Sequence, residues 1–99
     1  MSDWKSTVES NPGVIIDVRT RGEFEQGHLA EAAHQYDLLS GEFQEMIDSL
    51  DPDETYYLYC RTGNRSGQAE QMLRERGFTN VHNIGGYEEL VEAGFESAQ

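Results

Sequence analysis

Residues 55–66 read TYYLYCRTGNRS, an aromatic and β-branched run that gives way to a polar segment containing glycine. The first part is typical of a β-strand, and a helix is predicted to follow at residues 65–76. Cys60, the only cysteine, lies where strand and loop meet. Free backbone N–H groups and the positive end of a helix dipole at such a junction favour thiolate over thiol. Two arginines in the loop add positive charge. Cys60 is therefore a candidate nucleophile with a lowered pKa, and its substrate is expected to be anionic.

Strand and helix patterns alternate along the rest of the chain. The apolar run VIIDV at residues 14–18 predicts a strand buried on both faces of a parallel sheet, and weaker strands are expected at residues 32–36 and 80–84. Helices are expected after Asp3, within residues 19–27, from a cap at Ser40 to Leu50, at 65–76 and at 87–93. This order predicts an α/β fold with three layers, α/β/α, and four to five parallel strands. Ligands of such sheets bind at the carboxyl ends of strands, where Cys60 lies.

Length and composition narrow the class of protein. The 99 residues contain no linker-like stretch, so we expect one domain over residues 1–99. The net charge of −12 makes nucleic acid and an anionic membrane surface improbable partners. One cysteine cannot form an internal disulfide, and the sequence has neither a secretory signal nor an apolar run of membrane-spanning length. These features favour the cytoplasm.

Three charged residues near the first predicted strand, Asp17, Arg19 and Glu23, resemble an acid and base set. We interpret them as structural. Asp17 would anchor the turn after its strand, and Arg19 would pair with Glu23 four residues further on. The three histidines lack the spacing of metal ligands, so we expect no metal and no other cofactor.

Three stretches together resemble the family of rhodanese-like sulfurtransferases, in the order that the family has them. CRTGNRS at residues 60–66 resembles the active-site loop, the segment from IDVR at 16–19 to GHL at 27–29 resembles the N-terminal signature, and VHNIGGY at 81–87 resembles the last strand and its glycine turn. The resemblance covers about residues 14–94 and is closest to small single-domain members. The chain departs from the family in leaving little room for an extra edge strand before residue 14.

The resemblance implies the chemistry of sulfur transfer. Cys60 would attack the outer sulfur of a small anionic donor such as thiosulfate, become a persulfide, and pass that sulfur to a thiol, a protein or another nucleophile. A ring of loop N–H groups would stabilise the thiolate and the persulfide, and Gly63 would permit the turn. Substrate contacts are expected from Arg61, Thr62, Gly63, Asn64, Arg65 and Ser66. The role of Arg61 stays open, since a side chain next to the nucleophile can also point outward.

Two other classes use similar loops. A persulfide carrier or regulatory module would accept sulfur from an upstream desulfurase without turning over a donor itself. Cysteine phosphatases and arsenate reductases place five residues between cysteine and arginine, whereas this chain has four, from Arg61 to Asn64. The shorter loop forms a smaller ring, which suits a sulfur atom better than a tetrahedral phosphate.

Overall fold

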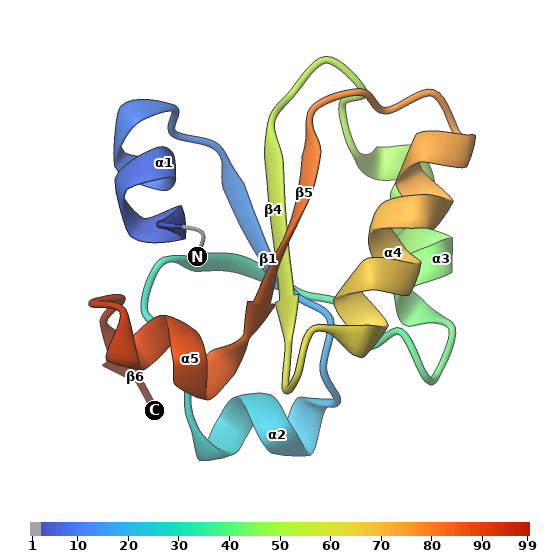
Figure 1. Ribbon diagram of the computed structural model, residues 1–99. Helices are drawn as coiled ribbons and strands as arrows, with labels where there is room; N and C mark the ends of the chain where they lie inside the picture. The colour runs from blue at the N-terminus through green and yellow to red at the C-terminus, as the bar shows by residue number, and fades with distance from the viewer. Residues whose placement is uncertain (1–2) are drawn as a thin grey trace.

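Four parallel strands form the central sheet of the computed structural model, which describes residues 3–99 (Figure 1). Their order is β3-β1-β4-β5, so the strand that ends in Cys60 lies between two others. The bounds are β1 Val14–Asp17, β3 Ala32–Gln35, β4 Tyr56–Cys60 and β5 Val81–Gly86. The predicted α/β fold and its parallel sheet are confirmed, with four strands. The two-residue strands β2 His28–Leu29 and β6 Ser97–Ala98 form a separate antiparallel ribbon.

Helices cover both faces of this sheet and the edge at which its strands end. The bounds are α1 Trp4–Ser10, α2 Arg21–Gln26, α3 Glu42–Met46 with the 3-10 turn η1 Ile47–Ser49, α4 Asn64–Glu75, and α5 Tyr87–Glu92. One face carries α3 and α4, and the other carries α1 and α5 (Figure 1). Helix α2 lies beyond the carboxyl ends of β4 and β5 (Figure 1). It is therefore close to the loop that follows Cys60.

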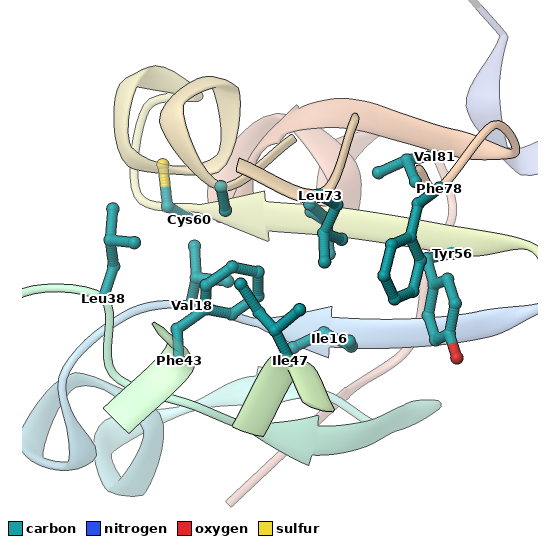
Figure 2. Close-up of a cluster of buried hydrophobic side chains, with 12 residues drawn as sticks. Ile16, Val18, Leu38, Phe43, Ile47, Tyr56, Cys60, Leu73, Phe78 and Val81 are labelled. Atoms are coloured by element: carbon teal, nitrogen blue, oxygen red, sulfur yellow. The ribbon is translucent and has the colours of Figure 1, made fainter. Parts of the chain in front are cut away.

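Alternation along β4 divides the buried side chains between two cores. Every residue of β4 is buried, with Leu58 and Cys60 in the core beneath α3 and α4 and Tyr57 and Tyr59 in the core on the opposite face. Cys60 lies at one end of the first core and Tyr56 at the other (Figure 2). A fully buried side chain such as that of Leu58 contributes about 1.5–3 kcal/mol to folding. The cysteine is thus held by the most deeply packed strand of the molecule.

The helix expected from Ser40 to Leu50 differs in the structure. It begins at Glu42, its N-cap is Gly41 without a side-chain capping bond, and the chain turns into the 3-10 form after Met46. The predicted N-cap at Ser40 was wrong by one residue because Gly41 adopts a left-handed conformation, φ +91°, just before the helix. The Ser40 hydroxyl still accepts the N–H of Glu42 over 3.4 Å. Before β1, residues 3–13 contain α1 and no strand, as the short N-terminal segment suggested.

A buried ion pair joins β1 to its neighbours at the carboxyl edge of the sheet. Asp17 is 0 % exposed and Arg19 5 % exposed, and Arg19 donates from Nε and Nη2 to the Asp17 carboxylate, the latter over 2.7 Å. The Tyr59 hydroxyl donates to Asp17 over 2.8 Å and accepts the N–H of Leu29 over 3.0 Å. Asp17 also accepts the backbone N–H of Arg19, which confirms that it anchors this turn. The cluster ties β1, β4 and β2 together.

The predicted pair between Arg19 and Glu23 was wrong. Arg19 binds Asp17 and the carbonyl of Gly27 instead, because a carboxylate removed from water at the end of β1 needs a charged partner. Glu23 is left to bind a different arginine.

No helix among residues 3–99 is long and apolar enough to cross a membrane.

Replacing Asp17 by alanine will leave the Arg19 charge buried without its partner, so the free energy of unfolding will fall by about 3–5 kcal/mol. Tyr59→Phe removes one hydroxyl from the same cluster and will cost about 1–3 kcal/mol. Asp53→Ala, at an exposed position, serves as control and will change stability by less than about 0.5 kcal/mol. Urea unfolding measures all three. Equal effects of Asp17→Ala and Asp53→Ala would contradict the structural role of the pair.

Candidate functional site

The loop after Cys60 is shaped by two glycines, one within the loop and one at the end of β5. Gly63 is the N-cap of α4 and adopts φ +99°, a left-handed conformation that favours glycine. Gly86 pairs with Cys60 across the sheet, and a Cβ at Gly86 would lie 2.5 Å from the carbonyl oxygen of Arg61. The loop therefore packs directly on the end of β5. A larger residue at Gly86 would push it away.

Hydrogen-bond donors surround the Cys60 sulfur. The backbone N–H of Gly63 donates to Sγ over 3.0 Å, and the hydroxyl of Ser66 lies 3.4 Å from Sγ. Cys60 is 0 % exposed, and Ser66 is buried with it in the first turn of α4. Cys60 and the loop that the sequence singled out thus lie together between the end of β4 and the start of α4.

Burial and hydrogen bonding have opposite effects on the thiol. Burial raises the pKa of Cys60, but the hydroxyl of Ser66 and the backbone N–H groups of Ser66, Thr62 and Gly63 lower it more, so the pKa lies below its ordinary value. A larger fraction of Cys60 is therefore thiolate at neutral pH than in an unfolded chain. The thiolate is the nucleophilic form.

Arg65 makes an ion pair that the sequence did not indicate. Its guanidinium binds both carboxylate oxygens of Glu23, over 2.8 and 3.0 Å, and so joins α2 to the start of α4. Glu23 also completes a capping box with Thr20 at the N-terminus of α2. The Arg65 hydrogen bonds lower the pKa of Glu23 to about 2, against a smaller opposing effect of burial. Arg65 is thus bound to protein, which weakens its assignment as a primary substrate contact.

Arg61 lies on a cleft beside the loop. The cleft has a volume of about 260 Å³, and its lining comprises Arg19, Glu23, Gln26, Gly27, Arg61, Tyr87 and Glu88. Arg61 is exposed and takes part in no ion pair among residues 3–99. Of the two loop arginines, Arg65 is held by a carboxylate and Arg61, among residues 3–99, is not.

The side chains of Thr62 and Asn64 make no hydrogen bond with the Cys60 sulfur. Thr62 is exposed and reaches the sulfur through its backbone N–H. Asn64 is exposed and accepts a hydrogen bond from Gln68 one helical turn away, over 3.2 Å. The structure brings neither side chain into contact with Cys60. In the described chain, residues 3–99, no group of three histidine, cysteine or acidic side chains lies close enough to hold a metal ion.

Asn83 belongs to the site, and the sequence did not point to it. Its Nδ2 donates to the carbonyl of Gly63 over 2.9 Å, and its Oδ1 accepts from the hydroxyl of Ser66 over 2.6 Å and from the N–H of Gly85 over 3.1 Å. The available signal was an asparagine, a residue type depleted in strands, inside the strand predicted at residues 80–84. Its meaning depends on which strand lies beside β4, and only the tertiary structure shows that.

The fold and the cysteine loop have counterparts among known proteins. A family model described as a rhodanese-like domain matches residues 2–93. The chain therefore belongs to the rhodanese-like domain family. Among solved structures, a rhodanese with anions from E. coli superimposes with a TM-score of 0.75 and 32 % identity, over 87 % of this chain and 96 % of that one.

Curated relatives include proteins named as enzymes. The chain is 36 % identical to the thiosulfate sulfurtransferase PspE of Escherichia coli over 78 residues, 77 % of this chain and 72 % of that protein. It is 37 % identical to the thiosulfate sulfurtransferase GlpE of Coxiella burnetii over 76 residues, 76 % of this chain and 68 % of that protein. It also spans 55 % of the uncharacterized protein YqhL of Bacillus subtilis, at 36 % identity.

Replacing Arg65 by alanine will destabilise the protein by about 1–2 kcal/mol at pH 7, since the Glu23 carboxylate loses its partner. The folded-state pKa of Glu23, about 2, lies below the ordinary 4.5, so the pair stabilises the fold above about pH 5. That contribution is lost as the pH falls towards 2. The difference in unfolding free energy between wild type and Arg65→Ala will therefore narrow from pH 7 to pH 3.

The exposed pair between Arg76 and Asp48 supplies the control for this experiment. Arg76→Ala removes the same charge from α4's C-terminal end and will change stability by less than about 0.5 kcal/mol at either pH. Urea unfolding at pH 7, 5 and 3 measures both variants. If the difference in unfolding free energy between wild type and Arg65→Ala is constant with pH, the pairing with Glu23 is contradicted.

Proposed function

We propose that the protein is a sulfurtransferase that moves sulfane sulfur through a persulfide on Cys60. The observation that carries this proposal is the Cys60 sulfur, held at the end of β4 with the Gly63 N–H at 3.0 Å and a pKa below its ordinary value. Family membership and relatives named thiosulfate sulfurtransferases support the choice of chemistry.

The first half-reaction transfers one neutral sulfur atom. The Cys60 thiolate attacks the outer sulfur of thiosulfate, a bond forms between the two sulfurs, and the bond to the sulfonate sulfur breaks with its electron pair. Sulfite leaves, and Cys60 carries a persulfide whose negative charge is on the terminal sulfur. Backbone N–H groups of the loop stabilise that charge as it develops.

The second half-reaction returns Cys60 to the thiolate. A thiolate acceptor attacks the terminal sulfur of the persulfide, and the sulfur–sulfur bond to Cys60 breaks with its electrons on Cys60. The acceptor leaves as a new persulfide. A free thiol fits a reducing compartment such as the cytoplasm, where low-molecular-weight and protein thiols are available as acceptors.

Arg61 is the cation that we assign to the anionic donor. It lines the cleft beside the loop and has no carboxylate partner among the residues described, whereas Arg65 is bound to Glu23. A charge-assisted hydrogen bond from a guanidinium to a sulfonate group is worth about 1.5–3 kcal/mol. Arg61 would thus orient the donor with its outer sulfur towards Cys60.

A persulfide carrier is the second candidate, and the complete burial of Cys60 is the observation that favours it. A buried sulfur is reached less readily by a free small molecule than by a partner that docks over the loop. In this role the protein would receive sulfur from a desulfurase and would turn over thiosulfate slowly or not at all.

Incubation with thiosulfate will add one sulfur atom to the intact protein, and a thiol acceptor will remove it. Cys60→Ser will gain none, because the nucleophile is absent. Intact-mass spectrometry before and after each addition measures the transfer, with sulfite release as a second readout. A wild-type protein that gains no sulfur from thiosulfate, but gains it from a desulfurase, would favour the carrier over the enzyme.

Replacing Arg61 by alanine will raise KM for thiosulfate about tenfold or more and change kcat less, since the lost contact binds the donor in the ground state as well. Arg76→Ala removes the same charge from the far end of α4 and controls for the change in net charge. Steady-state rates of sulfite release measure both. Equal KM values for the two variants would assign the donor to a different cation.

A further inference from the structure

The carboxamide of Asn83 is held in one orientation. Its Nδ2 donates to the Gly63 carbonyl over 2.9 Å, and its Oδ1 accepts the Gly85 N–H over 3.1 Å. Turning the amide over would place two donors against each other at Gly85 and two acceptors against each other at Gly63. Oδ1 is therefore a fixed acceptor directed at the first turn of α4.

The Ser66 hydroxyl lies between this acceptor and the reactive sulfur. Its oxygen is 2.6 Å from Asn83 Oδ1 and 3.4 Å from Cys60 Sγ. A hydroxyl has one hydrogen, so Ser66 donates to one of the two atoms at a time. Ser66 is 0 % exposed, which confines the choice to these neighbours. The short distance to Asn83 makes the carboxamide a strong competitor for that hydrogen.

The chemical state of Cys60 decides between the two acceptors. A thiol donates its own hydrogen to Ser66 Oγ, and the Ser66 hydrogen then points to Asn83. A thiolate is a charged acceptor and draws the hydrogen to Sγ, which leaves Asn83 Oδ1 with the Gly85 N–H alone. In a persulfide the charge is on the outer sulfur, so Sγ becomes a poor acceptor and the hydrogen returns to Asn83.

We propose that Asn83 is a positioning residue that accepts the Ser66 hydrogen when Cys60 is a thiol or carries a transferred sulfur, and yields it when Cys60 is a thiolate. Asn83 acts through Ser66 and does not touch the sulfur. It stabilises the uncharged and sulfur-loaded states of Cys60 relative to the thiolate. The statement about the loaded state rests on the proposed sulfur transfer, whereas the thiol and thiolate states do not.

The charged groups on the elements around Cys60 are the same in every variant. Arg65 comes from α4 with its partner Glu23 on α2, Arg61 comes from the loop, and Asp17 with Arg19 comes from the end of β1. On β5 the titratable residue is His82, which packs against Trp4 and Tyr57 on the opposite face of the sheet from Asn83. Variants at positions 66 and 83 leave all of these groups in place.

The test is a double-mutant cycle on the titration of Cys60. The rate of alkylation by iodoacetamide, followed by intact mass from pH 5 to 10, gives the apparent pKa without any sulfur donor. Asn83→Ala will lower this pKa by about half a unit, a threefold rise in the thiolate to thiol ratio, since the competitor for the Ser66 hydrogen is gone. Ser66→Ala will raise the pKa. In the Ser66→Ala background, Asn83→Ala will no longer lower it.

Two results would overturn the proposal. A rise in pKa of equal size from Asn83→Ala in both backgrounds would mean that Asn83 only supports the loop through Gly63, and an unchanged pKa would mean that the hydrogen is not contested. Asn80→Ala, an exposed asparagine just before β5, is the matched control and will leave the pKa unchanged. Asn83→Val, which suits a strand, repeats the cycle if urea unfolding shows that Asn83→Ala is not folded.

Loading with sulfur supplies a separate readout. In mixtures of thiosulfate and sulfite, the ratio of persulfide to thiolate will be about threefold lower in Asn83→Ala than in wild type. An unchanged ratio would overturn the part of the proposal that concerns the loaded state. A wild-type protein that never loads would contradict the proposed function and leave the alkylation cycle as the test of Asn83.

Discussion

The position of β4 between β1 and β5 is the constraint on which the rest of the structure depends. Because β4 is buried on both faces, its last residue, Cys60, ends in the interior at the edge where α4 begins. The chain must then leave the sheet and enter a helix within three residues. Gly63 permits that turn, and its N–H is directed at the sulfur as a result. Burial and polarity at Cys60 thus have one geometric cause.

Charged residues around this edge are arranged in pairs that join secondary-structure elements. Asp17 and Arg19 join β1 to the segment after α2, and Glu23 and Arg65 join α2 to α4. Both pairs are removed from water to a large extent, so each charge needs its partner. Within residues 3–99, Arg61 takes no part in this pairing and lies on the cleft beside the loop. Arg61 and Arg65 have the same side chain, and their surroundings place one on the cleft and bind the other to Glu23.

Strands β1 and β4, and the place of Cys60 at the end of β4, were predictable because they depend on local patterns. Val14–Asp17 and Tyr56–Cys60 are mostly apolar runs without polar alternation, a pattern that predicts a strand buried on both faces. The cap at Ser40 and the pair of Arg19 with Glu23 were predicted from spacing along the chain and were wrong. Spacing compares neighbours in sequence, whereas a glycine conformation at Gly41 and a buried carboxylate at Asp17 decided these contacts.

The sequence by itself determined the class of fold, the loop of seven residues that begins at Cys60, and the net charge of −12, because each is a property of order and composition. Only the tertiary structure decided that Arg65 binds Glu23, 42 residues away, and that Asn83 lies against Ser66, 17 residues away. A hydrogen bond between side chains needs its two atoms about 3 Å apart, whatever the number of residues between them in the sequence. Which polar groups share the sulfur's surroundings is therefore settled when the sheet and α4 pack together.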